Sequence, residues 1–357
     1  MQKIKNYSLF TAKAALAKPI ADATHILTEI SFIVLRLQLN SGVVGESYLL
    51  SFQYSPQAIA GALKDICELA IGENVYDTVT VYKKIDEANE YFGKEGVNRW
   101  AQAAVNIAMW DAWCKTLDQP IWRVLGAHNF KVPVYGSGGW LSYTPQELIA
   151  EVTGYKKRGF NAVKIKVGKH DWKEDLERLA QVREAVGNNI GIMMDANQGM
   201  DVSSALQLAR EAKALNIHWF EEPVDHNDFQ GYQLLKNQAG VSLAMGEREY
   251  STLALRELIK LNAIDIWQPD ILRLGGVEAW RNSAAVALAH HVPVLPHYYK
   301  DYDVPLLCTI SNGAGAESFD WIDSLIDHPL QIDSGYARPH DRAGWGFNFK
   351  DEFLTQI

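Results

Sequence analysis

From about residue 132 onward, one unit of the sequence repeats: a short apolar stretch ends in a polar residue and is followed by a longer stretch with helical spacing of apolar residues. Apolar strands that alternate with helices form parallel sheets. Eight such units over roughly 190 residues favour an α/β fold with a closed (β/α) barrel over an open doubly wound sheet. The eight apolar stretches are VPVYGSG, NAVKIKVG, IGIMMDAN, HWFEEP, VSLAMGE, AIDIWQPD, PVLPH and AGAESFD.

Capping residues mark two of the helix starts in this repeat. Thr144-Pro-Gln-Glu147 is a capping box with proline at the first helical position, and Asp201 is placed to cap the helix after the third strand. A dinucleotide-binding sheet would instead need G-x-G-x-x-G at the start of a helix that follows a strand. The nearest match, GSGGWL, has Leu141 at the third glycine position, so this alternative is disfavoured.

The first 125 residues have a different organisation. Residues 30–49 alternate apolar and polar residues on both sides of Asn40-Ser41-Gly42, which predicts a β-hairpin. Residues 56–71 and 76–92 are predicted to be helical, and residues 97–117 to form a long buried helix. After Trp321 no further strand–helix unit follows, so we expect the tail to return to this first part.

Composition excludes several classes of partner. The formal net charge of −9 argues against nucleic acid and against anionic membranes. Cys67, Cys114 and Cys308 show no CxxC spacing, so neither a disulfide framework nor a zinc site is predicted, and a cytoplasmic location is expected. Lys13 and Lys18 interrupt the early apolar run, which argues against an export signal, and no apolar run approaches the ~20 residues of a membrane helix.

Ionisable residues stand at the end of every predicted strand from the second to the eighth. In barrels the carboxyl ends of the strands meet at one mouth, where the active groups lie. Isolated charges at strand ends are often salt bridges between neighbouring strands, but seven ends in succession indicate a site. In strand order these residues are Lys164 and Lys166, Asp195 with Asn197, Glu221, Glu247, Asp270, His297 and Glu317.

Three of these residues predict a metal site. Asp195, Glu221 and Glu247 end three adjacent strands, and three converging carboxylates repel each other unless a cation lies among them. Oxygen-only ligands favour Mg²⁺ over softer metals.

Two acid/base groups are expected beside this metal. Lys164 and Lys166 lie on one face of their strand, and two close ammonium groups near a divalent cation should lower the lysine pKa toward neutrality. Lys166 is then the base, and Lys164 its modulator and a carboxylate contact. On the other side, Asp270 should orient His297 as a second base. Glu317, if protonated, would donate to a substrate oxygen; the alternative is a buried ion pair.

This set of residues suits abstraction of a proton next to a carboxylate. A metal and ammonium groups bind the carboxylate and stabilise the enediolate that forms when its α-proton leaves. Enolase-superfamily sites use a lysine or histidine base with one or two Mg²⁺ ions in this way.

The residues named above give the chain a resemblance to the enolase superfamily, mandelate racemase subgroup, over essentially its whole length. The helix AQAAVNIAMWDAWCKTLDQPIWRVLG is similar to the family's segment before the barrel, although Cys114 stands where a glycine is common. The matching segments are K-x-K at Lys164 and Lys166, MDAN at Asp195, FEEP at Glu221, MGE at Glu247, QPD at Asp270, PH at His297 and the strand-eight Glu317.

The resemblance implies an architecture and a cofactor. It implies a modified (β/α)7β TIM-like barrel over residues 126–322, with an α+β capping domain from residues 1–125 and a C-terminal segment, 323–357, that returns to the capping domain. It also implies Mg²⁺ on Asp195, Glu221 and Glu247, with Lys166 and the His297–Asp270 pair as opposed acid/base groups, and a homo-oligomer.

The implied activity is dehydration of a sugar acid (an aldonate or aldarate) to a 2-keto-3-deoxy acid. Alternatives are a cycloisomerase that opens an anhydro-sugar acid, a racemase or epimerase, and a sugar-acid binding protein without catalysis. Specificity in this family lies in capping-domain loops, here about residues 17–28 and 47–54, where His25, Tyr48, Ser51 and Gln53 can bind hydroxyls. Three barrel residues complete the predicted substrate contacts: Asn197, Trp140 and Tyr298.

Overall fold

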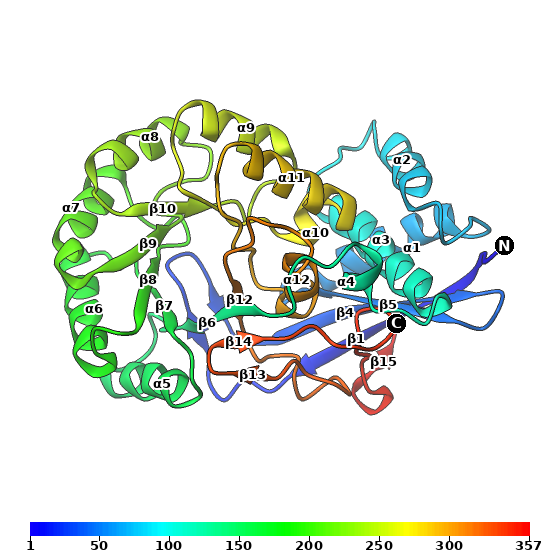
Figure 1. The fold of residues 1–357 in the computed structure, drawn as a ribbon, viewed down its shortest axis with the longest axis horizontal. Helices are drawn as coiled ribbons and strands as arrows, with labels where there is room; N and C mark the ends of the chain where they lie inside the picture. Colours follow the sequence, from blue (N-terminus) through cyan, green and yellow to red (C-terminus); the bar gives the residue numbers. More distant parts are fainter.

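A computed structural model describes residues 1–357, and its largest sheet is the predicted barrel (Figure 1). Parallel pairing runs from β11 through β10, β9, β8 and β7 to β6, and β12 pairs with the other side of β6. The barrel strands are β6 (Val132–Gly138), β7 (Ala162–Lys166), β8 (Gly191–Asp195), β9 (Ile217–Glu221), β10 (Ser242–Met245), β11 (Ile266–Trp267) and β12 (Ala316–Ser318).

The seventh barrel position differs from the predicted strand PVLPH. Only Val294 forms bridges there, to Trp267 on one side and to Gly313 on the other, so the ring closes through one residue. Pro293 and Pro296 flank that residue and have no backbone N–H to donate, which prevents a regular strand.

Helices surround the barrel strands, as Figure 1 shows for the green and yellow segments. Both predicted helix starts are confirmed: Thr144 and Glu147 form the capping box, and the Asp201 side chain accepts the N–H of Ser204. The barrel helices are α5 (Pro145–Lys157), α6 (Trp172–Val186), α7 (Val202–Ala212), α8 (Phe229–Gln238), α9 (Thr252–Lys260), α10 (Ile271–Leu274), α11 (Val277–Ala289) and α12 (Lys300–Leu307).

The N-terminal part forms an antiparallel sheet in the order β15–β1–β4–β5, with helices packed on it. The predicted hairpin is β4–β5, and the predicted long helix α3 packs so closely on β5 that a Cβ on Gly45 would lie 2.1 Å from the Ala108 carbonyl oxygen. The elements are β1 (Ile4–Ala14), β2 (Ile20–Ala21), β3 (Ile26–Leu27), β4 (Ile30–Leu39), β5 (Val44–Leu50), α1 (Pro56–Ala70), α2 (Thr78–Ala88), α3 (Val97–Thr116) and α4 (Ile121–Val124).

The C-terminal residues contact both parts of the molecule. The short strands β13 (Ile332–Asp333) and β14 (Tyr336–Ala337) extend the sheet beside β6, and β15 (Thr355–Gln356) pairs with β1. Asp351 also accepts a hydrogen bond from Arg36 at 2.7 Å. The exact domain boundaries at residues 125 and 322 stay predictions.

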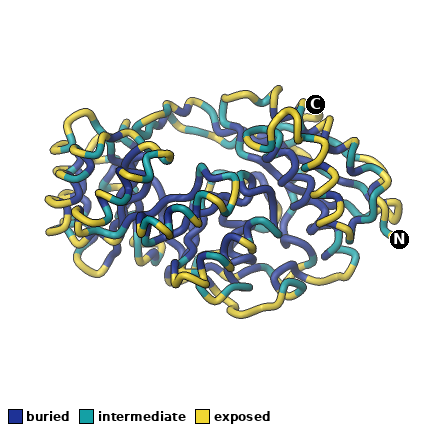
Figure 2. Tube along the Cα trace, turned by 90° about the horizontal axis from the view of Figure 1, so that it is seen from above, coloured by how far each residue is buried: buried dark blue, intermediate teal, exposed yellow.

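Buried side chains fill the interior of the barrel below the strand ends. In Figure 2 the buried trace runs through the interior of the molecule, with exposed loops at its periphery. Six buried side chains fill the barrel beneath the strand ends, so polar groups at those ends are shielded from solvent below. These six are Tyr135, Met193, Trp219, Ala244, Ile266 and Leu295. No helix of the structure is long and apolar enough to cross a membrane.

Candidate active site

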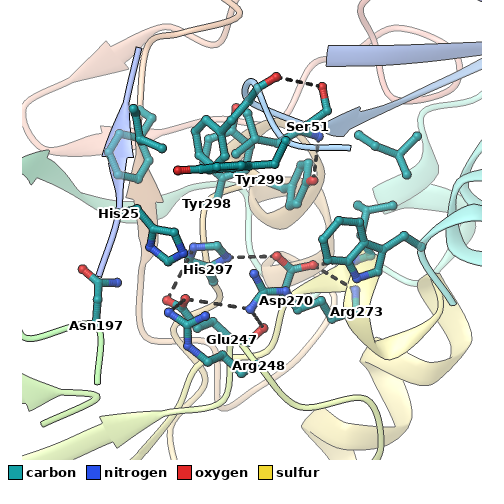
Figure 3. A pocket seen from close by; sticks show the side chains of 18 of the residues that line it. His25, Ser51, Asn197, Glu247, Arg248, Asp270, Arg273, His297, Tyr298 and Tyr299 are labelled. Atoms are coloured by element: carbon teal, nitrogen blue, oxygen red, sulfur yellow. Dashed lines mark hydrogen bonds and ion pairs between the residues drawn. The ribbon is translucent and has the colours of Figure 1, made fainter. Parts of the chain in front are cut away.

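A cavity of about 310 Å³ lies between the barrel mouth and the capping domain (Figure 3). The β2–β3 hairpin closes part of it, and the N–H of Leu141 holds that hairpin by donating to the Ala21 carbonyl oxygen at 2.7 Å. The capping domain supplies Asp22, His25, Leu27, Leu49, Leu50, Ser51, Phe52, Tyr54, Ser55, Ile59, Val97 and Trp100 to the lining. The barrel supplies Trp140, Lys166, Asn197, Glu247, Arg248, Asp270, Leu272, Arg273, His297, Tyr298, Tyr299, Phe319 and Trp321.

Lysines and carboxylates form a buried cluster at the ends of strands β7, β8, β9 and β12. Lys164 Nζ lies 2.5 Å from Glu221 Oε1, 2.6 Å from Glu317 Oε1 and 3.5 Å from Asp195 Oδ2. Lys166 Nζ lies 2.5 Å from Asp195 Oδ2 and faces the cavity. The structure therefore brings together both lysines and three of the predicted acidic residues.

The contacts of the two lysines act against the expected lowering of their pKa. Burial opposes the charge of Lys164, but attraction to Glu221 and Glu317 outweighs it and raises its pKa well above the ordinary value. For Lys166, burial and the nearby Lys164 lower the pKa, yet the attraction of Asp195, Glu317 and Asp22 together outweighs both and raises it. The sequence-based prediction counted the repulsion between the two ammonium groups and the charge of a divalent cation, and it omitted the carboxylates that each lysine contacts.

The three carboxylates predicted to bind metal have contrasting electrostatic surroundings. Burial raises the pKa of Glu221 to about 7, against the attraction of Lys164, and repulsion from Asp195 adds to the rise. Burial also opposes ionisation of Glu247, but His297, Arg248 and Arg273 outweigh it and lower its pKa. The surroundings therefore favour the ionised form of Glu247 and disfavour that of Glu221.

His297 and Asp270 form the predicted pair. His297 Nδ1 lies 2.9 Å from Asp270 Oδ2, and His297 Nε2 lies 3.5 Å from Glu247 Oε2 (Figure 3). Burial lowers the pKa of His297, but Glu247 and Asp270 outweigh this effect and raise it above the ordinary value. A carboxylate on Nδ1 leaves Nε2 as the nitrogen that can exchange a proton with a substrate.

Glu317 is an ionised carboxylate in this arrangement. Burial opposes its charge, but Lys164, His297 and Lys166 outweigh burial and lower its pKa to about 2. Its Oε2 accepts the backbone N–H of Tyr298 at 2.9 Å. Glu317 thus forms a buried ion pair with Lys164 in this structure, and its role as a protonated donor to a substrate oxygen stays a prediction.

Left-handed backbone conformations occur just after three of the strands that carry the site. The φ angles are 42° at Asn197, 36° at Glu222 and 67° at Tyr298, which are uncommon for residues with a Cβ. The Asn197 N–H donates to Asp195 Oδ1 at 2.8 Å, and its own side-chain oxygen is buried without a hydrogen-bond partner. Two of these residues, Asn197 and Tyr298, line the cavity.

Most of the predicted substrate contacts line the cavity, and two loop residues do not. His25, Ser51, Asn197, Trp140 and Tyr298 are part of the lining. Tyr48 instead packs on Tyr302 and Phe349 in the interior, with 1% of its surface exposed. Gln53 donates to the Ile26 carbonyl oxygen at 2.8 Å and so joins the two loops rather than facing the cavity.

The sequence-based prediction missed three charged residues of the lining. Arg248 Nε donates to Glu222 at 2.9 Å, and Arg273 donates to the Glu247 carbonyl oxygen at 2.6 Å. Asp22, in the β2–β3 hairpin, also lines the cavity. A signal was present for Arg248, which directly follows the strand-end Glu247, whereas nothing local to the sequence marks Asp22.

Two known domain families match the sequence of this chain. Residues 6–126 match the mandelate racemase/muconate lactonizing enzyme N-terminal domain, and residues 147–353 match the enolase C-terminal domain-like family. The chain belongs to the enolase superfamily, in its mandelate racemase subgroup. Both halves of this enolase-superfamily fold are therefore present in one chain, and the predicted barrel with its capping domain is confirmed.

Several relatives of this enolase-superfamily chain have assigned activities. L-talarate/galactarate dehydratase of Salmonella typhimurium is 30% identical over 98% of this chain and 90% of that protein. Arabinonate dehydratase of Saccharolobus solfataricus is 28% identical over 89% and 88%, and 3,6-anhydro-α-L-galactonate cycloisomerase of Streptomyces coelicolor is 26% identical over 95% and 94%. A crystal structure of the Salmonella typhimurium dehydratase, liganded with Mg and L-lyxarohydroxamate, superposes with a TM-score of 0.93 at 28% identity, covering 100% of this chain and 94% of that one.

Proposed function

We propose that this protein is a Mg²⁺-dependent sugar acid dehydratase that converts an aldonate or aldarate to a 2-keto-3-deoxy acid. The observation that carries the proposal is the pairing of two acid/base groups, Lys166 and His297, at one cavity beside a cluster of buried carboxylates. Two such groups suit β-elimination, in which one proton leaves carbon and another is delivered to the departing oxygen.

The donor atoms of the three predicted ligands suit a magnesium ion. Asp195, Glu221 and Glu247 offer only oxygen donors, are buried, and come from the ends of β8, β9 and β10. The pKa of Glu221, raised to about 7 first by burial and then by repulsion from Asp195, indicates that this cluster favours an additional cation. Bound there, Mg²⁺ would stabilise the negative charge that develops on the substrate carboxylate.

The chain's own residues would carry the proton transfers. Lys166 Nζ or His297 Nε2, depending on the configuration at C2, accepts the proton from C2, and the C2–H electron pair moves into the carboxylate. Lys164 offsets the resulting charge. The C3–O bond then breaks as His297 or Lys166 protonates the leaving hydroxyl, which departs as water. The enol product takes up a proton at C3 and becomes the 2-keto-3-deoxy acid.

The relatives support dehydration as the first candidate. Two of them act on sugar acids as dehydratases, one on L-talarate and galactarate and the other on arabinonate. Galactarate is a dicarboxylic and arabinonate a monocarboxylic sugar acid, so these two relatives do not distinguish between the two substrate classes.

Cycloisomerisation is the second candidate, because one relative is a 3,6-anhydro-α-L-galactonate cycloisomerase. The same abstraction at C2 would then expel a ring oxygen at C3 in place of a hydroxyl, and no water would be lost. Trp140, Phe319 and Trp321 form an aromatic wall in the cavity that an anhydro ring can contact.

Proton NMR in D₂O with Mg²⁺, across a panel of aldonates, aldarates and anhydro-sugar acids, tests both candidates. A deuterated C3 methylene beside a new keto group establishes β-elimination, and the responding substrate separates dehydratase from cycloisomerase. Loss of only the α-proton signal means a racemase or epimerase. Binding without any exchange means a sugar-acid binding protein, and chelation of Mg²⁺ must abolish turnover for the metal assignment to stand.

We also propose a cytoplasmic location and a homo-oligomeric assembly. The cytoplasmic location is supported by Cys67, Cys114 and Cys308, which are all buried and unpaired, as is usual in a reducing compartment. Cell fractionation tests it. The homo-oligomeric assembly rests on the family resemblance, and light scattering tests it.

A further inference from the structure

The two ends of the cavity carry different fixed charges. Its lysine and arginine side chains, Lys166, Arg248 and Arg273, all come from the barrel. The capping domain contributes no lysine or arginine to the lining, and the carboxylate it contributes is Asp22, next to His25. A substrate carboxylate therefore finds ammonium and guanidinium groups only on the barrel side, where Glu247 and Asp270 also line the cavity, and Asp22 repels it on the capping side.

Asp22 has one carboxylate oxygen free to contact a ligand. Every hydrogen bond to this side chain uses Oδ1, which accepts the backbone N–H groups of Thr24 and His25 at 2.7 Å each. Oδ2 has no partner within the protein, although the side chain is only 10% exposed. Burial raises the pKa of Asp22, but the hydrogen bond with His25 and the charge of Lys166 outweigh burial and lower it, so the group is ionised at neutral pH.

The hairpin that carries Asp22 is held against the barrel. A Cβ on Gly199 would lie 2.3 Å from Ala23 Cβ, and one on Gly168 would lie 2.7 Å from the same atom, so the loop packs into a space that only glycine leaves open. The bond from the Leu141 N–H to the Ala21 carbonyl oxygen fixes the other side of the turn. These contacts hold Asp22 at the cavity in this structure.

The remaining surroundings offer little compensation for a second carboxylate. Phe319 and Trp321 stack at 4.5 Å between ring centroids, and Trp140 extends this apolar wall. Arg248 is bound to Glu222, and Arg273 donates to the Glu247 backbone, so both guanidinium groups are engaged at the barrel end. An uncharged hydroxymethyl or ring end matches this environment better than a carboxylate.

We infer that the site selects a monocarboxylic sugar acid over a dicarboxylic one, and that Asp22 is the specificity-determining residue. The single carboxylate binds at the barrel end, while Asp22 Oδ2 accepts a hydroxyl at the capping end and repels a second carboxylate there. This inference rests on the proposed function, since it assigns the substrate class of the same site.

The test compares each active aldonate with the aldarate that differs from it only in carrying a carboxylate in place of the terminal hydroxymethyl group. The ratio of the two kcat/KM values is measured for the Mg²⁺-loaded wild type and for Asp22→Asn, Asp22→Glu and Asp171→Asn. Asp171 caps α6 by accepting the Lys173 N–H, so Asp171→Asn removes one negative charge outside the cavity. Dissociation constants of both acids from calorimetry give a ratio of affinities that does not depend on turnover.

The expected result is a wild-type preference for the aldonate that falls roughly tenfold or more in Asp22→Asn, because like-charge repulsion is removed. Asp22→Glu and Asp171→Asn should keep the preference. A wild-type preference for the aldarate, or an unchanged ratio in Asp22→Asn, overturns the inference and leaves the proposed function standing. If neither acid undergoes elimination, the proposed function fails. The dissociation constants then test the inference separately: binding of neither acid, or tighter binding of the aldarate, overturns it as well.

Discussion

His297 Nδ1 and Asp270 Oδ2 lie 2.9 Å apart, while Asp270 Oδ1 accepts the N–H groups of Leu272 and Arg273 at 2.8 and 3.0 Å. The same carboxylate thus begins helix α10 and orients the imidazole. Because the helix start holds one oxygen in place, the other is fixed in direction, and the histidine ring is oriented without any substrate present.

Replacing Asp270 by asparagine should separate these two roles. The amide oxygen can still cap α10, but the carboxylate charge and the acceptor for Nδ1–H are altered, so kcat should fall by roughly 10²–10⁴-fold. The melting temperature should change little. Asp228→Asn is the matched control, because Asp228 caps α8 by accepting the Gly231 N–H at 2.8 Å away from the cavity. A kcat within threefold of wild type in Asp270→Asn would contradict the assigned pair.

Removing either acid/base group should abolish elimination. Lys166→Ala and His297→Asn are each expected to lower kcat by about 10³-fold or more, with the Mg²⁺ affinity measured in parallel by calorimetry. The control is Lys169→Ala, which removes a lysine from the same strand–helix loop that pairs with Glu174 at its surface. If exchange of the C2 proton in D₂O continues at the wild-type rate in both active-site variants, other groups carry the proton.

The contact between Gly199 and Ala23 predicts a compensating pair of substitutions. In Gly199→Ala the new Cβ would meet Ala23 Cβ at 2.3 Å, so the β2–β3 hairpin must move away from the barrel mouth. We expect KM to rise by about tenfold with a smaller effect on kcat, since binding geometry is disturbed more than the acid/base groups. Ala23→Gly, added to Gly199→Ala, should restore KM because it removes the opposing methyl group.

A second glycine provides the control for that experiment. Gly154 lies within α5, where an added Cβ meets no atom within 4 Å. Gly154→Ala should leave KM unchanged and stabilise the protein by about 0.5–1 kcal/mol, because alanine loses less conformational freedom in a helix. Failure of Ala23→Gly to rescue Gly199→Ala would show that the hairpin does not control substrate binding through this contact.

Asp301 predicts a pH dependence of stability. It is 2% exposed, neither of its carboxylate oxygens has a hydrogen-bond partner, and burial raises its pKa to about 7. The unfolded chain releases this proton near pH 4. Between about pH 4 and pH 7 the folded state therefore binds more protons than the unfolded state, and the stability contribution of this residue falls as pH rises.

Asp301→Asn should remove the decrease in stability with rising pH that Asp301 causes, because asparagine resembles the protonated aspartic acid side chain. At pH 8 the variant is expected to be more stable than wild type by roughly 2–4 kcal/mol, and at pH 4 the two should be nearly equal. Urea unfolding at a series of pH values measures the difference, with the exposed Asp118→Asn as a control. A difference between wild type and Asp301→Asn that does not vary with pH would contradict the assigned pKa.

Much of the fold could be predicted because the strand–helix repeat depends on local patterns. Thr144 and Asp201 cap helices through contacts within three residues, and short-range spacing reveals such contacts. The prediction of a seventh strand was wrong because Pro293 and Pro296 have no backbone N–H to donate. Only one residue of that apolar segment, Val294, forms bridges to its neighbours.

The sequence predicted where the site residues lie better than it predicted their pKa values. Strand-end positions placed Lys166 and His297 at the cavity, since parallel strands end at one edge. The pKa of Lys164 depends on Glu221 and Glu317, which lie 57 and 153 residues away along the chain, and only the folded geometry shows how close they come. The cavity contact of Asp22 likewise depends on how the β2–β3 hairpin docks, which no local pattern specifies.

Pairing of β15 with β1, together with the bond from the Phe349 N–H to Glu46 at 2.6 Å, has a consequence for biosynthesis. The sheet that contains β1, β4 and β5 leaves the ribosome early, yet its edge strand comes from residues 355–356. During translation Phe10 and Thr11, the residues of β1 that pair with β15, stay without this partner while the whole barrel is made, and an open strand edge invites pairing with other chains. Residues 355–356 therefore close this part of the edge only after the barrel has been synthesised.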